Sequence, residues 1–573
     1  NDPQFFPYRY GHAVWSYLGG TFGDDKIGQI LNLAGRTGDP FGSIEMVLEV
    51  PINDLSNRWR NETESYFAEA RNETQSPDAY GRRVVYEPEG EDGILNLGPA
   101  ISPDGNEIIY MSERDLFSIE MFLADAHTGQ VKRRLTKNMV DPHFESLQFV
   151  SSAGEWNQDG RHFVVAGVSG GDAVISVLDV LEGGKIAREV RLNPVGEAYT
   201  PTWSPDGTRV AFTGHQNGYT DLYIVDLETE EISRLTTDKY ADLQPSWSPD
   251  GRYLAFTTDR FTTDLELLVA GPYQIALYDL ETGDIQALPG FDDQFRNFNP
   301  QWSPEGQNLY FVSDHDGISN LYRLDMETRE LHLVTDLWTG VSGLSSISPA
   351  ISVAKQTGEV AFSVNKGGPF SYEIYVIDDP QVLVGEPAPE MLVQVDASVI
   401  PPVERASLDH PQILQNARLG LADPITFEDA DYQSSLGLDF VSNPTLAFGA
   451  SDFGTFFAAG ASVYWSDLMG NKTLQTLLNI NTSFGNILQG TAALVGYENL
   501  SSRWNWAVIG GQVPMVLRQF GYQAGTYEGR QAIEITELRF FEINRQITGI
   551  VAYPFNRNSR VEFSGSARQL DFA

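Results

Sequence analysis

One short motif recurs along the middle of the chain and constrains its fold more than any other feature. Trp203-Ser-Pro-Asp-Gly207 returns as Trp247-Ser-Pro-Asp-Gly251 and as Trp302-Ser-Pro-Glu-Gly306. Each copy is followed by short alternating apolar segments that end in Asp-Leu-Glu-Thr or Asp-Met-Glu-Thr. A pattern that returns in this way indicates one supersecondary unit repeated along the chain.

The repeat extends to six units when the surroundings of the motif are aligned. Three weaker copies lie at Ile101-Ser-Pro-Asp-Gly105, Trp156-Asn-Gln-Asp-Gly160 and Ile351-Ser-Val-Ala-Lys355. Pro-Asp-Gly forms a turn, because proline fixes φ at the first corner and glycine accepts the positive φ of the next. Alternation at 209–213, 221–226 and 232–236 predicts the strands of the third unit. Four strands in a unit of about 45 residues are typical of a propeller blade.

The last unit lacks a counterpart of its outermost strand. After Ile374-Tyr-Val-Ile-Asp378 the chain turns to Pro380 and a proline-rich run. Arg82-Arg-Val-Val-Tyr86, ahead of the first unit, matches the strand that is missing. We therefore expect residues 82–86 to pair with the strand at 372–378 and to complete the sixth blade.

The repeated strings, Trp-Ser-Pro-Asp-Gly, then a run like Ile-Ala-Phe, then one like Asp-Leu-Tyr-Val-Asp, resemble those of TolB-like six-bladed propellers. The resemblance implies a six-bladed β-propeller over residues 76–379. Such propellers serve as binding platforms, as periplasmic scaffolds and as gates on prolyl-oligopeptidase-like enzymes, so the fold alone does not select a function. Among these roles we expect that of a binding platform, with a protein or peptide partner bound in the central funnel or on the top face.

Composition narrows the classes of partner. The chain has 573 residues, a formal charge of −40 and no cysteine. Disulfides and thiolate metal sites are thereby excluded, and nucleic acid is not expected as a partner because like charges repel. The chain begins at Asn1 without methionine or signal peptide and stops at Asp571-Phe-Ala573 inside an expected strand. We expect both ends to be cuts in a longer protein.

From Asp431 onward the pattern changes to a second kind of β structure. Apolar residues alternate with small or polar ones around Leu436–Phe440, Leu478–Phe484 and Trp504–Val508. Strands of about ten residues with one apolar face are what a transmembrane β-barrel requires, because sheet crosses a bilayer only when it is closed. On this pattern alone, a soluble sandwich with one wet face is an equal alternative.

Four strings in this region tip that balance. Leu436-Gly-Leu-Asp-Phe-Val441, Phe453-Gly-Thr-Phe456, Tyr464-Trp-Ser-Asp-Leu-Met-Gly-Asn471 and Arg503-Trp-Asn-Trp506 are similar to the start of BamA-like surface-antigen barrels. The resemblance implies an outer-membrane barrel of which residues 431–573 supply about half, so that the last strand exposes an unpaired edge. Residues 380–430, with Pro387, Pro389, Pro401, Pro402 and Pro411, are expected to be a linker.

The segment before the propeller has helical character. Apolar residues at helical spacing predict helices over 8–34, with a break at Gly23-Asp-Asp25, and further short helices at 44–48 and 55–59. Phe6-Pro-Tyr-Arg-Tyr-Gly-His-Ala-Val-Trp-Ser-Tyr-Leu-Gly-Gly20 is similar to the C-terminal helical part of gluzincin-like metallopeptidase domains. The zinc motif of that family, His-Glu-x-x-His, does not occur in this chain.

No residue is nominated for catalysis, cofactor binding or metal binding. His12 lacks a second histidine one helical turn away, so we interpret it as a packing residue. Gly167-Val-Ser-Gly-Gly171 matches a nucleophile elbow, but Ser169 falls where a blade hairpin is expected. Asp314-His-Asp-Gly317 and Asp259-Arg260 lack calcium-loop spacing and are interpreted as turns. We also predict no cofactor.

These patterns together predict a mainly β protein: a helical peptidase remnant (1–75), a six-bladed propeller (76–379), a linker (380–430) and a partial antiparallel β-barrel (431–573). We expect a non-catalytic fragment of an exported, outer-membrane-anchored bacterial protein that acts in the periplasm. Its propeller would bind a protein or peptide. Two alternatives stay open: part of a membrane-tethered zinc metallopeptidase whose catalytic helix lies upstream, or an outer-membrane assembly or transport protein.

Overall fold

The computed structural model describes residues 7–572 except 87–94, 115–117, 137–142, 145, 289–293, 316, 367–370, 389–399, 403, 407–430, 452–453, 482–486, 488 and 557–558. The chain divides into two compact units, 1–422 and 423–573. Each unit is described by itself below.

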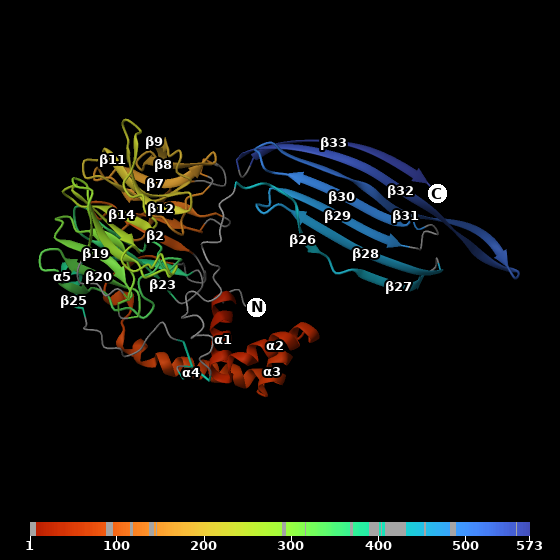
Figure 1. Ribbon diagram of the computed structural model, residues 1–573, viewed down its shortest axis with the longest axis horizontal. Helices are drawn as coiled ribbons and strands as arrows, with labels where there is room; N and C mark the ends of the chain where they lie inside the picture. The colour runs from red at the N-terminus through yellow and green to blue at the C-terminus, as the bar shows by residue number, and fades with distance from the viewer. Residues whose placement is uncertain are drawn as a thin grey trace. The chain divides into compact units, whose positions relative to one another are not determined.

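The first unit contains six small antiparallel sheets (Figure 1). From the first strand of each sheet outward they are β2 (Asn96–Ile101), β3 (Glu107–Ser112), β4 (Glu120–Asp125) and β5 (Val131–Arg134); β6 (Glu155–Trp156), β7 (His162–Ser169), β8 (Asp172–Asp179) and β9 (Lys185–Arg191); β10 (Glu197–Trp203), β11 (Arg209–Gln216), β12 (Tyr219–Asp226) and β13 (Ile232–Arg234); β14 (Asp242–Trp247), β15 (Tyr253–Thr258), β16 (Gln274–Asp279) and β17 (Ile285–Ala287); β18 (Asn297–Trp302), β19 (Asn308–Ser313), β20 (Asn320–Asp325) and β21 (Leu331–Leu333); and β22 (Ile351–Val353), β23 (Val360–Asn365), β24 (Tyr372–Ile377) and β1 (Arg82–Val85).

The first strands of these sheets form a ring. β2 contacts β6 and β22, and β10, β14 and β18 continue the series between them. Apolar side chains from neighbouring sheets share common cores, such as the one that joins Val164 and Ile175 to Trp203 and Phe212. This arrangement is that of a β-propeller, in which each sheet buries its faces against the two sheets beside it.

The predicted closure of the last sheet is confirmed. β1 pairs antiparallel with β24, with Arg82 opposite Val376 and Val85 opposite Ile374. Val84 and Val85 are buried in a core that also holds Ile101, Ile374 and Val376. A strand that precedes the first sheet in sequence therefore completes the last one.

Four of the first strands carry a bulge just before the repeated motif. Gly98, Thr200, Gln244 and Asn299 have positive φ, each precedes a proline, and the strand register shifts at each position. A bulge inserts one residue and re-aims its side chain. Here the Gln244 amide oxygen accepts the Asn299 N–H at 2.8 Å, and the Asn299 amide oxygen accepts the Ile351 N–H at 2.9 Å. The bulges thus tie adjacent first strands together.

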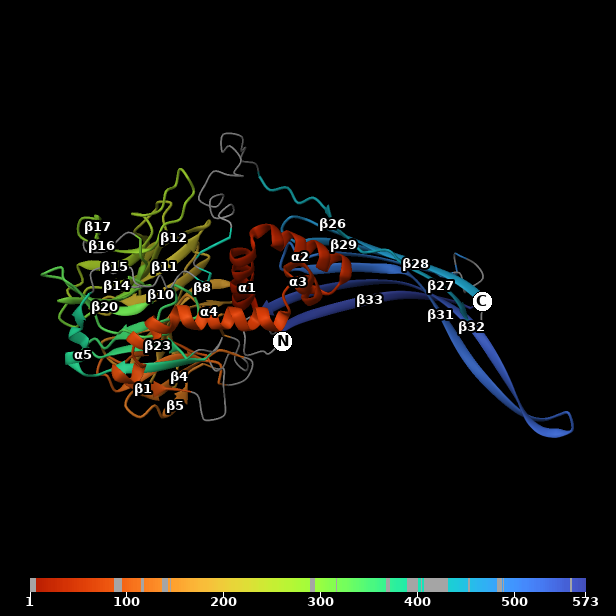
Figure 2. The ribbon, with the colours of Figure 1, turned by 90° about the horizontal axis from the view of Figure 1, so that it is seen from below.

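The N-terminal segment is helical, as expected, and consists of α1 (Pro7–Phe22), α2 (Asp24–Thr37), α3 (Pro40–Leu48) and α4 (Ile52–Glu73). Gly23 breaks the first pair, with φ of 101°. Tyr17, Leu18 and Ile30 form a small core with Leu48 and Leu55. α4 is longer than the predicted segment at 55–59 (Figure 2). None of the described helices is long and apolar enough to cross a membrane.

The first residues of the expected linker belong to the propeller instead. Residues 380–384 form α5 (Pro380–Val384), whose Leu383 is buried in the core of the last two sheets. Residues 386–387 form β25 (Glu386–Pro387), which adds a fifth strand beside β21. Proline is tolerated there because β25 is an edge strand. Residues 389–399 and 407–430 of the expected linker lie outside the described residues.

The second unit is one antiparallel sheet of β26 (Gly437–Val441), β27 (Thr445–Ser451), β28 (Gly454–Ser466), β29 (Lys472–Asn481), β30 (Thr491–Asn499), β31 (Asn505–Tyr527), β32 (Arg530–Asn556) and β33 (Ser559–Phe572). β26 and β27 both pair with β28, and β33 ends the series at the other edge. No pairing among the described residues joins these edges, so the sheet is open. β31 and β32 continue as a two-stranded hairpin beyond their neighbours (Figure 2). Phe453 and residues 482–484, which contributed to the barrel prediction, lie outside the described residues.

Candidate functional site: the channel and faces of the propeller

Three of the repeated tryptophans join one sheet to the next by a hydrogen bond. The Trp302 indole N–H donates to the Ser246 carbonyl at 3.2 Å, and that of Trp203 donates to the Glu155 carbonyl at the same distance. Trp156 makes the equivalent bond to Ala100 at 3.0 Å. Each acceptor lies one residue before the motif of the preceding sheet. All of these indoles are buried. The tryptophans are therefore core residues rather than a ligand surface.

The Ser-Pro-Asp-Gly turns satisfy their own polar groups. The Ser204 hydroxyl donates to Asp206 at 2.6 Å and accepts the Arg209 N–H at 2.9 Å. These hydrogen bonds hold the pKa of Asp206 below its usual value, since the Ser204 hydroxyl and the Thr208 N–H stabilise the carboxylate. A Cβ at Gly251 would lie 3.8 Å from the Pro205 ring of the preceding motif. The turns therefore contact one another along one face of the propeller, and their polar groups are already hydrogen-bonded within each turn.

The central channel is narrow. A cavity of about 40 Å³ is lined by residues of all six first strands and their approaches, among them Pro99, Glu155, Thr202, Gln244 and Asn299. A second, of about 30 Å³, lies toward the turns, between Trp156, Trp203, Trp247 and Lys355. Since about 10–15 Å³ of such space holds one water molecule, each cavity has room for only a few water molecules and neither admits a peptide.

An ion pair crosses the turn side of the channel. The Lys355 ammonium lies 3.0 Å from the Glu155 carboxylate, and both side chains are largely buried. The other Glu155 oxygen accepts the Thr202 hydroxyl at 2.9 Å and the Trp203 N–H at 2.6 Å. Both carboxylate oxygens of Glu155 thus have partners, Lys355 on one side and β10 on the other, which indicates a structural role.

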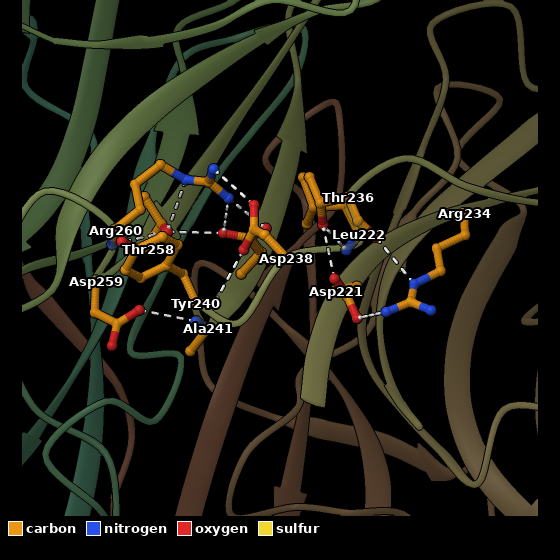
Figure 3. A network of polar contacts seen from close by, with 11 residues as sticks. Asp221, Leu222, Arg234, Thr236, Asp238, Tyr240, Ala241, Thr258, Asp259 and Arg260 are labelled. Carbon is orange, nitrogen blue, oxygen red and sulfur yellow. Dashed lines mark hydrogen bonds and ion pairs between the residues drawn. The ribbon is translucent and has the colours of Figure 1, made fainter. Parts of the chain in front are cut away.

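The opposite face carries a polar network between two sheets (Figure 3). It lies where β15 leads to β16 and where β13 leads to β14, and hence at the other end of the strands from the Trp-Ser-Pro-Asp-Gly turns. Arg260 donates to both Asp242 oxygens at 2.7 Å and to Asp238 at 3.0 Å. Beside it, Arg234 donates to Asp221 at 2.6 Å.

A threonine after the outer strand caps the start of the third strand. Thr236 accepts the Leu222 N–H at 3.0 Å and donates to Asp221. Thr335 does the same for Leu321 and Asn320, both at 3.0 Å. Thr136 repeats the arrangement with Met121 and Glu120. Because it recurs in three sheets, the cap belongs to the fold rather than to one binding site.

Burial dominates the electrostatics of this network. Desolvation raises the pKa of Asp242 above that of an ordinary aspartate, and the charge of Arg260 opposes the shift. The pKa of Asp221 is raised for the same reason, with Arg234 opposing. Buried carboxylates need such partners, since removing one leaves an uncompensated charge. Arg234 therefore compensates Asp221 within the sheet β10–β13, and Arg260 ties Asp242 at the start of β14 to Asp238 in the connection before it.

The candidate site residues considered in the sequence analysis do not form a common site in the structure. Ser169 ends β7 and pairs with Asp172 across a tight hairpin, so the predicted hairpin is confirmed and no elbow forms. His12 is exposed, so its interpretation as a packing residue was wrong. Asp314 pairs with Arg296 at 2.7 Å, and Asp316 lies outside the described residues. Across the part of the chain that the structure describes, no group of three metal-ligating side chains occurs.

Two signals in the sequence could have located more of this architecture. Thr200-Pro-Thr-Trp203, Gln244-Pro-Ser-Trp247 and Asn299-Pro-Gln-Trp302 share an x-Pro-x-Trp pattern that marks three of the four bulges. Arg234-Leu-Thr236 and Arg134-Leu-Thr136 mark the threonine caps. Both patterns recur at the repeat interval and need no alignment of relatives to be seen.

Comparison with known proteins agrees with this architecture. The TolB beta propeller domain family, PD40, matches residues 143–264. An uncharacterised protein of Agrobacterium fabrum, Atu1656, is 27% identical over 224 residues, which cover 38% of this chain and 70% of that protein. The Tol-Pal system protein TolB of Francisella tularensis is 30% identical over 201 residues, covering 34% of this chain and 42% of TolB.

The chain thus spans less than half the length of the TolB relatives that it matches. A crystal structure of TolB from Acinetobacter baumannii is 19% identical, covers 59% of this chain and 72% of its own, and superposes with a TM-score of 0.35. Residues 143–264 thus match the TolB beta propeller family, PD40, and the TolB relatives are similar to this chain over about a third of its length. The family match lies within the first unit.

Proposed function

We propose that the six sheets are the blades of a closed six-bladed propeller that binds a protein or peptide partner in the bacterial periplasm. The binding surface is the face opposite the Trp-Ser-Pro-Asp-Gly turns. The PD40 match and the TolB relatives, which are named for the Tol-Pal system, support this assignment. The proposal assigns no chemistry to this chain.

The observation that carries the proposal is the closed channel. Two cavities of about 40 and 30 Å³ lie along it and hold only a few water molecules, whereas ligand pockets for small molecules are about 300 Å³ or larger. Recognition must therefore use a face. One face is built from turns that satisfy their own polar groups, and the other carries the longer connections between strands.

We also propose that the second unit is the first part of an outer-membrane barrel. Large apolar side chains are exposed along its strands, including Leu438, Phe440 and Phe448. Aromatic residues cluster near one end of the sheet, where Tyr497 contacts Trp506 at 5.3 Å between ring centroids and Trp504 contacts Tyr553 at 4.9 Å. Exposed apolar strands with aromatic residues near their ends are typical of membrane barrels.

Site-specific photo-cross-linking tests the binding face. A photoreactive residue at Tyr219, on the proposed face, is compared with one at Leu181, in the turn between β8 and β9 on the other. Both positions are exposed. In periplasm-exported protein we expect a discrete adduct from position 219 and none from 181. Equal adducts from both positions, or none from 219, would contradict the assigned face.

The metallopeptidase alternative stays a prediction. It requires zinc ligands, and the described residues supply no cluster that could hold a metal. The helices α1 to α4 would then border a catalytic domain supplied by residues outside this sequence. The assembly or transport alternative rests on the second unit alone.

A further inference from the structure

The connection between β15 and β16, residues 259–273, is longer than the two-residue hairpins at the same position in the second and third sheets. It lies on the face proposed to bind a partner, next to the polar network of Figure 3. We call residues 261–269 the apolar loop. A long connection on a rigid scaffold is where binding residues concentrate.

The apolar loop exposes four large hydrophobic side chains within nine residues. The exposed fractions are 45% for Phe261, 38% for Leu265, 72% for Leu268 and 42% for Val269. Elsewhere in the described part of residues 76–388, exposed large hydrophobics are scattered singly, as at Leu181 and Tyr219. Scattered ones need no explanation, whereas a cluster marks an interaction site.

The loop is held in shape from within. Asp264 and Val269 exchange backbone hydrogen bonds at 2.9 and 3.0 Å, and the Asp264 carboxylate accepts the N–H groups of Glu266 and Leu267 at 2.9 Å. The Thr262 hydroxyl donates to the Pro272 carbonyl at 2.6 Å and closes the base. The four apolar side chains are therefore displayed on an ordered turn.

Backbone strain points to the same residue that is most exposed. Leu268 has φ of 55°, in the left-handed region that glycine and asparagine prefer and that bulky residues rarely adopt. A leucine kept there gains nothing from burial in this chain. Strain of this kind, observed at an exposed position, supports a hypothesis of function.

The charges around the loop indicate the chemistry of the partner. Asp264 and Glu266 are exposed beside the apolar side chains. Arg260, the basic residue at the base of the loop, is only 12% exposed and is neutralised by Asp238 and Asp242. The whole chain carries a charge of −40. A complementary surface is apolar at its centre and basic at its rim.

We infer that the apolar loop docks a cationic amphipathic segment of the partner protein, with Leu268 as the central anchor. This inference rests on the proposed function and names the residues of the binding face that make the contact. The loop inserts its leucines into the apolar side of the segment, and Asp264 and Glu266 meet its lysines or arginines.

The probe is a labelled synthetic helix with leucine on one face and lysine on the other. It is titrated against the full chain at about 0.15 M salt, where interactions between distant charges are screened. The variant Leu268→Gly removes the anchor and relieves the positive φ, so its thermal midpoint should equal or exceed that of the parent. Leu181→Ser removes an equally exposed leucine elsewhere and is the matched control. A second helix, with serine in place of leucine, measures attraction by charge alone.

We expect Leu268→Gly to weaken binding of the leucine-lysine helix at least tenfold and Leu181→Ser to leave it unchanged. The serine-lysine helix should bind weakly and equally to all three proteins. Equal affinity of the parent and Leu268→Gly for the leucine-lysine helix would overturn the docking role of the loop. It would not bear on the binding face, which the cross-linking at Tyr219 tests separately. No binding of the leucine-lysine helix to the parent would also overturn it.

Discussion

Replacing Trp302 by alanine tests whether the repeated motif holds the propeller together. The indole is 4% exposed, and its N–H bonds to the Ser246 carbonyl of the preceding sheet. Truncation of a buried tryptophan costs about 3–5 kcal/mol, and leaving a buried carbonyl unpaired adds about 1 kcal/mol or more. The total, roughly 4–6 kcal/mol, approaches the whole stability of many domains.

Urea unfolding followed by tryptophan fluorescence measures this change. With a slope of about 2–3 kcal/mol per molar urea, the midpoint of Trp302→Ala should fall by roughly 2 M. Trp504→Ala, which truncates an exposed tryptophan of the second unit, is the control and should leave the midpoint of the propeller unchanged. A Trp302→Ala protein as stable as the parent would refute the role of the motif as a core element.

Two tryptophan-to-phenylalanine substitutions separate the contribution of packing from that of hydrogen bonding. Among the described residues the buried Trp247 indole N–H has no hydrogen-bond partner, whereas that of Trp302 has one. Trp302→Phe should therefore lower the unfolding free energy by about 1 kcal/mol more than Trp247→Phe, the usual net value of one hydrogen bond. The reverse order would show that the hydrogen bond between sheets contributes little.

Three further predictions concern closure, capping and acid stability. Val84→Asp, which buries a charge in the β1 strand, should lower the urea midpoint and expose the chain near residue 86 to limited proteolysis; an unchanged digestion pattern would count against closure by β1. Thr236→Val should destabilise the propeller by about 1–2 kcal/mol because it leaves the Leu222 N–H unpaired, whereas Thr237→Val, at an exposed neighbour, should not; equal midpoints would remove the role of the cap. Hydrogen bonds from the Thr128 N–H and hydroxyl lower the pKa of Asp125 to about 2, so its contribution is present above pH 4 and is lost as pH falls toward 2; Asp125→Ala should make urea midpoints less dependent on pH in that window, and an identical dependence would contradict the assignment.

Much of the propeller could be predicted from local pattern. The strands at 209–213 and 221–226 lie within β11 and β12, and the pairing of residues 82–85 with β24 is as expected. These features follow from alternation and turn chemistry, which act over a few residues. The repeat amplified them, because each weak signal occurs several times.

The rest depends on contacts between distant residues. The pairing of β25 with β21 places Glu386 opposite Leu333, and no local pattern in Gly385-Glu-Pro387 predicts this pairing. The exposure of Leu265 and Leu268 could not be predicted from the sequence, because an apolar side chain is buried or exposed according to its surroundings in the fold. The narrow channel likewise results from six first strands meeting, which sequence spacing alone cannot measure.

The closure by β1 determines how the propeller responds to a pulling force. Arg82 at the start of β1 lies opposite Val376 near the end of β24, whereas the chain leaves the propeller only after α5 and after β25, which pairs with β21. Tension applied at the start of β1 would load its pairs with β24 one after another, beginning with the contact of Arg82 with Asp378, rather than all together. Peeling of this kind needs far less force than sliding two strands along each other. The seam between β1 and β24, which completes the ring, is therefore its mechanical weak point, and a load at the start of β1 would open this strand pair first.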